Sequence, residues 1–161
     1  MKITPFLGIL EKLRAKREPL ADDVGDHWVY ESLKGPDYCF EIQSDQDENV
    51  TSITLTFVSD WSLRPSLYPP GQGPYSYLEE AAKKPTPKRR IALVEQLCQT
   101  LMAQLGLKVP EIAIGSFQSA GFALGDDCKS LNWEQGREFV RVSLYEDKVT
   151  GIHYRLGEVE R

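Results

Sequence analysis

The chain has 161 residues, of which 41% are hydrophobic and 27% charged, and its formal net charge at pH 7 is −5. This length fits one domain with its own core, and the ordinary balance of hydrophobic and charged residues excludes a wholly disordered chain. No apolar stretch approaches the roughly 20 residues of a membrane-spanning helix. We therefore expect a single domain over residues 1–161 and no membrane segment.

The first predicted element is an amphipathic helix that begins at Thr4-Pro5, a plausible N-cap followed by proline at the first helical position. Its apolar residues recur with helical spacing as far as Leu13, and basic residues are concentrated in its last turns. Pro19 is expected to end the helix. The acidic stretch that follows, Glu18–Asp26, is interpreted as a loop.

Three strands are predicted next, over residues 27–33, 38–43 and 51–58, because apolar and polar residues alternate there with β-branched enrichment. The polar run 44–49 between the last two strands is typical of a hairpin loop. The segment 64–87 then holds six of the ten prolines and several tyrosines. We interpret it as a long loop with one or two helical turns at 77–84, of the kind that packs down or meets a partner.

The longest helix is predicted over residues 88–105, opened by Thr86-Pro87 as cap and first-turn proline and closed by Gly106. A broad apolar stripe that includes Cys98 marks it as the core helix. Short strands are expected at 111–117 and 122–124, and a clearer hairpin at 139–145 and 150–156. The fold class is therefore α+β, mainly an antiparallel sheet of about five to seven strands with an N-terminal helix and one long core helix.

No catalytic, metal or cofactor motif stands out. The odd set of cysteines, Cys39, Cys98 and Cys128, has no zinc-like or disulfide-like spacing, and the two histidines, His27 and His153, have no ligand pattern around them. We expect reduced thiols in the cytoplasm, and the apolar run 6–10 is too short for a signal peptide. No cofactor and no enzymatic activity are expected.

Charge is distributed unevenly along the chain. Residues 18–60 carry eleven acidic side chains and one basic one, Lys34, whereas the segment 83–90 is basic. Cations in the first turn of the core helix oppose its dipole by about 0.3–1 kcal/mol. They could form an anion site there, but we favour pairing with the molecule's own acidic segment. The net negative charge argues against nucleic-acid binding.

The leading hypothesis is a protein-binding module whose acidic surface, with aromatic anchors, docks on a basic partner protein. Immunity proteins that neutralise bacterial toxins have this physical profile, and secretion chaperones are the alternative. The predicted partner-binding residues are Asp22, Asp23, Asp26, Trp28, Glu31, Asp45, Asp47, Glu48, Trp61, Tyr68, Tyr75 and Tyr77.

A competing hypothesis is an enzyme or small-ligand binder. Its site would lie between the 64–87 loop and the sheet, with Tyr75, Tyr77, Arg89 and Arg141 as candidates. A concave site with converging polar groups would favour this class, and an exposed acidic patch would favour the first. The protein-binding hypothesis also depends on whether the acidic segments 18–26 and 45–48 meet at one edge of the sheet.

Overall fold

The fold was analysed in a computed structural model that describes residues 1–22, 25–32, 36–63, 68–69 and 71–158, with the backbone alone for 20–22, 25–28 and 31–32. The helices are α1 (Thr4–Lys12), α2 (Asp60–Leu63), α3 (Ser76–Lys83), α4 (Lys88–Gln104) and α5 (Ile114–Ser119). The strands are β1 (Lys16–Asp22), β2 (Gly25–Ser32), β3 (Cys39–Ser44), β4 (Val50–Thr56), β5 (Ala123–Leu124), β6 (Ser130–Gln135), β7 (Glu138–Tyr145) and β8 (Lys148–Leu156). The predicted α+β class is confirmed, but the sheet has eight strands rather than five to seven.

Two antiparallel meanders form this sheet. The first runs β1-β2-β3-β4 and the second β5-β6-β7-β8, and they join where β4 pairs antiparallel with β8. Ile53 lies opposite Tyr154 across this junction. Strands about a hundred residues apart in the chain therefore hold the two halves together.

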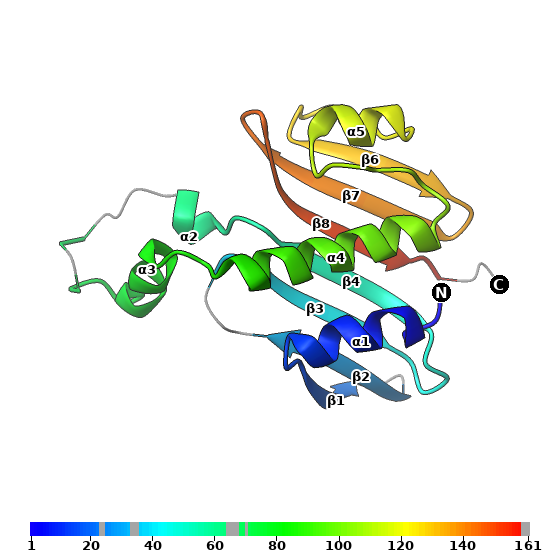
Figure 1. Ribbon diagram of the computed structural model, residues 1–161, viewed down its shortest axis with the longest axis horizontal. Coiled ribbons are helices and arrows are strands. Elements are labelled where there is room, and N and C mark those ends of the chain that lie inside the picture. The colour runs from blue at the N-terminus through cyan, green and yellow to red at the C-terminus, as the bar shows by residue number, and fades with distance from the viewer. Residues whose placement is uncertain (23–24, 33–35, 64–67, 70, 159–161) are drawn as a thin grey trace.

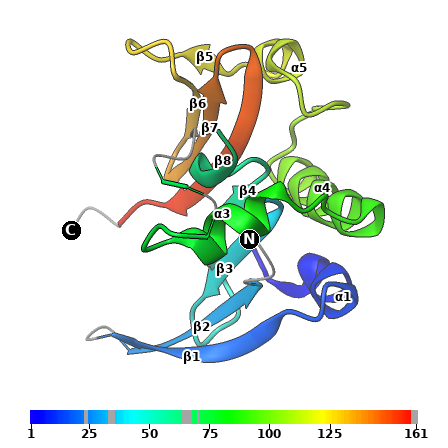
Figure 2. The ribbon, with the colours of Figure 1, turned by 90° about the vertical axis from the view of Figure 1, so that its left-hand side faces the viewer.

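Helices α1, α4 and α5 cover one face of the sheet, with α4 across its middle (Figures 1 and 2). The strand residues that face these helices are almost fully buried, such as Ile42, Ile53, Val142 and Tyr154. The opposite face carries the alternating polar residues and is covered by none of these three helices (Figure 2). In the described ranges, no helix is both long enough and apolar enough to span a membrane.

The core helix α4 agrees closely with its prediction, because its apolar stripe and its C-terminal glycine are strong signals. Leu97, Cys98 and Leu101 are fully buried on that stripe. Gly106 takes a left-handed φ of 71°, and Leu107 N donates to Met102 O at 2.9 Å, which closes the helix. The predicted cap is wrong, however: Pro87 occupies the N-cap position and no side chain caps the helix.

The N-terminal helix ends earlier than predicted, and the loop expected at Glu18–Asp26 is wrong. Arg14 adopts a left-handed φ of 54°, and Ala15 N donates to Leu10 O at 3.0 Å, so the helix closes there. The next residues form β1, which includes Pro19. Proline is tolerated because β1 is an edge strand.

Two further expectations fail in the C-terminal half. The strand predicted at 111–117 is replaced by α5, because Ile114 and the fully buried Phe117 lie three residues apart, which is helical spacing. Strand β6 was not predicted. It places Leu131 in the core and Trp133 against Phe122, with ring centroids 6.3 Å apart.

Candidate functional site

The two acidic turns of the first meander lie at the same end of the sheet. Strand β2 pairs antiparallel with β3, with Trp28 opposite Ser44 and Ser32 opposite Phe40. The start of β2 therefore adjoins the end of β3. Asp22 and Gly25, which pair at the end of β1 and the start of β2, thus lie at the same end of the sheet as the 45–49 turn. We call this the 45–49 end of the sheet and the opposite one the α3 end.

The 45–49 turn is internally braced, and this leaves its outer carboxylates exposed. The Asp45 carboxylate accepts hydrogen bonds from the backbone amides of Asp47 and Asn49, both at 2.9 Å. Burial alone would raise the pKa of Asp45, but these bonds and nearby Lys2 lower it overall. Asp47 and Glu48 are exposed and form no ion pair within the described part of the chain.

The remaining acidic candidates belong to the first hairpin. The backbone places Asp22 and Asp26 at its turn and Glu31 opposite Glu41, farther along the sheet. Trp28 lies in β2, and the side chains of these four residues lie outside what the structure describes. Asp23 lies outside the described residues altogether.

The four aromatic candidates of the 61–77 region lie at the α3 end, away from the acidic turns (Figure 1). The rings of Trp61 and Tyr75 pack together with centroids 5.3 Å apart. Tyr68, Tyr75 and Tyr77 are 48%, 54% and 66% exposed. The 45–49 turn and these four aromatic residues therefore lie at opposite ends of the sheet, whereas Trp28 and Glu31 lie along β2 between them.

The basic segment 83–90 also lies at the α3 end, so it does not neutralise the 45–49 turn. Arg90 Nε donates to Tyr38 O at 3.0 Å. Lys84, Lys88 and Arg89 form no ion pair with any described residue, nor does Lys83. The expected pairing of this cluster with the acidic segment is therefore wrong for these four residues.

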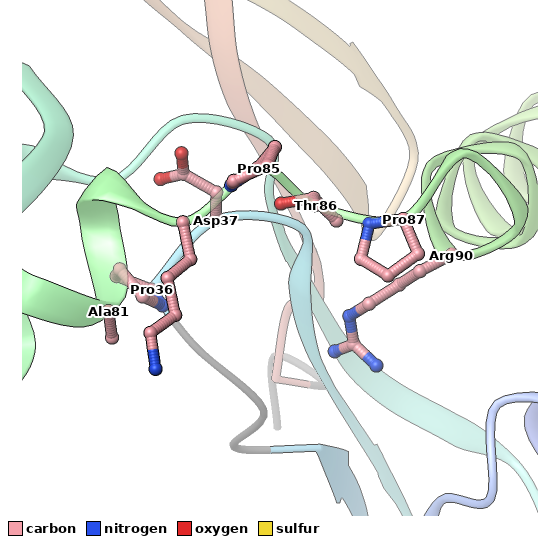
Figure 3. A pocket seen from close by; sticks show the side chains of 8 residues that line it. Pro36, Asp37, Ala81, Pro85, Thr86, Pro87 and Arg90 are labelled. Atoms are coloured by element: carbon pink, nitrogen blue, oxygen red, sulfur yellow. The ribbon is translucent and has the colours of Figure 1, made fainter.

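Figure 3 shows a pocket of about 310 Å³ at the start of α4, between Asp37 on one side and Thr86, Pro87 and Arg90 on the other. The carboxylate of Asp37 and the guanidinium of Arg90 point away from each other (Figure 3). Asp37 is instead bonded to α2, accepting from Ser59 N at 2.8 Å and Ser62 Oγ at 2.7 Å. This acid therefore anchors the beginning of the 59–87 segment.

A broader hollow of about 520 Å³ opens on the uncovered sheet face, where Trp61 and Leu78 approach strands β4, β7 and β8. It lies where the competing hypothesis expected a cleft. None of the four residues proposed for that cleft, Tyr75, Tyr77, Arg89 and Arg141, lines it. Its polar lining comes instead from hydroxyl-bearing residues, Asp60 and His153.

His153 sits in the middle of this face, with Thr54 and Arg141 opposite it on the two neighbouring strands. Thr54 Oγ1 lies 3.0 Å from His153 Nδ1, within hydrogen-bond distance. Burial lowers the pKa of His153, and Arg155 lowers it further, while Glu41 opposes the change. The imidazole is therefore held neutral near pH 7.

This shift in the pKa of His153 predicts a pH dependence of stability. The folded state resists protonation of His153. The contribution of this histidine to the free energy of unfolding is therefore complete above the ordinary histidine pKa of about 6.5 and declines as the pH falls below it. The free energy of unfolding should fall between about pH 7.5 and 5.5, by less in His153→Gln. The slopes of the free energy of unfolding against pH can differ between the two proteins by at most about 1.4 kcal/mol per pH unit, the limit for one titrating group. Urea titrations at several pH values measure it, and equal slopes in the two proteins would contradict the prediction.

Neither Cys39 nor Cys98 shows the lowered pKa of an activated nucleophile. Burial raises the pKa of Cys98 to about 12, and burial also raises the pKa of Cys39, although Arg90 opposes it. Across the described ranges, no three His, Cys, Asp or Glu side chains gather as a metal ion would require.

Comparison of the chain with protein-family models, with curated proteins and with solved structures found no match.

Proposed function

We propose that the protein is a binding module whose 45–49 end docks on a basic partner protein. The observation that carries this proposal is the strand register, which brings the 45–49 turn and the paired residues Asp22 and Gly25, at the end of β1 and the start of β2, to one end of the sheet. The exposed carboxylates of Asp47 and Glu48 belong to this surface. Charges of one sign gathered at one end of a molecule accelerate association with an oppositely charged surface.

The separation of charge supports the same proposal. The basic segment lies at the far end of the sheet, so it leaves the acidic turns free to act on a partner. Lys2 lies beside this turn, and its Nζ donates to the backbone oxygen of Asp47 at 2.9 Å rather than to a carboxylate. A basic effector, of the kind that immunity proteins or secretion chaperones bind, is the partner class that we propose.

The test is a charge reversal with a matched control. Asp47→Lys with Glu48→Lys changes the acidic turn, while Glu146→Lys with Asp147→Lys makes the same change in the β7–β8 turn at the α3 end. Glu48 and Glu146 both have a left-handed φ, 63° and 53°, so the two variants carry similar backbone demands. Asp45 is retained because it braces its turn.

In affinity capture from the native cell, followed by kinetics with the captured partner, the 47/48 variant should associate at least about tenfold more slowly. The 146/147 variant should stay within about twofold of the unchanged protein. Raising the salt from about 0.1 M to about 1 M should also weaken capture, because the screening length falls from about 10 Å to about 3 Å. Equal capture by both variants, or no stoichiometric partner at low salt, would refute the proposal.

A further inference from the structure

A second pocket at the α3 end is lined mainly by cations. It has a volume of about 330 Å³ and lies between the C-terminal end of α1 and the first turn of α4. These two helix ends are at the same end of the molecule (Figure 1). The cationic lining residues are Lys12, Arg14, Arg89 and Arg90. Among the residues whose side chains the structure describes, no acidic one lines this pocket.

Three of the four cations around this pocket are poorly compensated. Lys12, Arg14 and Arg89 are exposed and have no ion-pair partner among the described residues. Elsewhere in the described chain, the guanidinium of Arg141 lies 3.6 Å from the Asp127 carboxylate, and that of Arg155 lies 4.9 Å from the centre of the Phe139 ring. Like charges that converge without a counter-charge repel one another, and a bound anion would relieve that repulsion.

One of the four cations is held in place by the sheet. Arg90 donates to Tyr38 O, and its guanidinium lies 5.9 Å from the centre of the Phe40 ring. Arg90 also lines the pocket of Figure 3, so it forms part of the wall that the two pockets share. A fixed guanidinium is a pre-organised contact for an oxyanion, because less side-chain entropy is lost on binding.

The first turn of α4 adds backbone donors to these charges. This helix has 17 residues, no acidic residue in its first turn and no side-chain cap. Its first i to i−4 bond runs from Ile91 N to Pro87 O, which leaves the amides of the preceding turn open to a ligand. Buried Leu13 and Leu93 contribute an apolar lining, which strengthens electrostatic attraction within the pocket.

We propose that this pocket binds a small ligand through a diphosphate group. The three cations without an ion-pair partner already exceed the charge of one phosphate, which is about −2. The planar forks of three arginines suit bidentate contacts with phosphoryl oxygens. A long nucleic acid fits less well, because the cations surround one pocket in a molecule with a net charge of −5. The site is independent of the 45–49 end, so either proposal can fail without the other.

The experiment is calorimetric titration of the full-length protein at low ionic strength, with inorganic pyrophosphate in one arm and ADP in the other. Both should give saturable 1:1 binding that weakens with added salt. Arg14→Gln with Arg89→Gln should weaken binding at least about tenfold, since each removes a charge-assisted hydrogen bond. The control, Lys108→Gln with Lys148→Gln, removes two exposed charges outside the pocket and should stay within about twofold.

The two arms identify the source of the diphosphate. Similar affinities indicate recognition of the inorganic group alone, and at least about tenfold tighter binding of ADP indicates a nucleotide. The proposal is overturned if neither probe saturates, or if the pocket and control variants weaken equally. It is also overturned if sedimentation shows a salt-sensitive oligomer that the unchanged and control proteins form but the pocket variant does not. In that case the acidic turn of a second copy would occupy the pocket. The pocket variant should still bind the basic partner. This measurement distinguishes a failure of the diphosphate proposal from a failure of the proposed function.

Discussion

Replacing Tyr154 by alanine is expected to lower the free energy of unfolding by about 3–5 kcal/mol, the usual cost of removing a large ring from a core. The side chain is fully buried in β8, between Ile53 of β4 and Val140 of β7. A domain of this kind is stabilised by only about 5–15 kcal/mol, so the melting temperature should fall by roughly 6–20 °C. Urea and thermal unfolding measure the effect.

Two further variants show which part of Tyr154 matters. Its hydroxyl donates to Glu138 Oε1 at 3.2 Å, so Tyr154→Phe should cost about 1.5 kcal/mol, as for a hydrogen bond to a carboxylate. Tyr145 lies on the neighbouring strand and is 47% exposed, and Tyr145→Ala should change stability by less than about 0.5 kcal/mol. If Tyr154→Ala were as mild as Tyr145→Ala, the packing described here would be wrong.

Adding a single methyl group at Gly151 should also destabilise the protein, by about 1–3 kcal/mol. A Cβ at this position would lie 2.8 Å from the backbone oxygen of Leu55, which is too close for any ordinary contact. The obstacle is main chain, so it cannot rotate away as a side chain could. Gly151→Ala must therefore push β8 away from β4, the strand pair that joins the two meanders.

The matched control is the same substitution at Gly8, in the interior of α1. A Cβ there meets nothing within 4 Å, and alanine is the better helix former by about 0.5–1 kcal/mol. Gly8→Ala should raise the urea midpoint, whereas Gly151→Ala should lower it. A shift of the same sign in both variants would contradict the close approach of β8 to β4.

The elements that were predicted correctly are those with a strong periodic signal. In β3 and β4 the alternation of apolar and polar residues appears directly as alternating burial. The α4 helix combines a continuous apolar stripe with a terminal glycine in the left-handed conformation. Such local patterns need no knowledge of the tertiary contacts.

The missed strands carried a weaker signal or none. The Lys16–Glu18 stretch of β1 is charged and followed by proline, and only its place at the sheet edge permits the strand. The helix before it ends at Lys12, and the left-handed position that closes it is held by Arg14, where a glycine would have been the usual marker. In β6 the alternation is present, with Leu131 and Trp133 facing the core, but polar neighbours obscure it.

The separation of the acidic 45–49 turn from the aromatic residues of the 61–77 region could have been partly anticipated from the sequence. Strand β4 leads away from the 45–49 turn over seven residues, and each residue of a strand advances about 3.4 Å. The chain therefore reaches Trp61 and the tyrosines at the far end of the sheet. The cation-lined pocket could not be anticipated in this way, because it depends on how the end of α1 lies against the start of α4.

The edge strand β1 also determines where the sheet stops. Lys16, Arg17, Glu18 and Pro19 are all exposed along it. A ninth strand would find no amide hydrogen at Pro19, and it would have to cover three charged side chains. At the other edge, β5 offers only two residues. Both margins are therefore poor templates for fibril-like growth, so an open sheet of eight strands can exist at high concentration without recruiting copies of itself edge to edge.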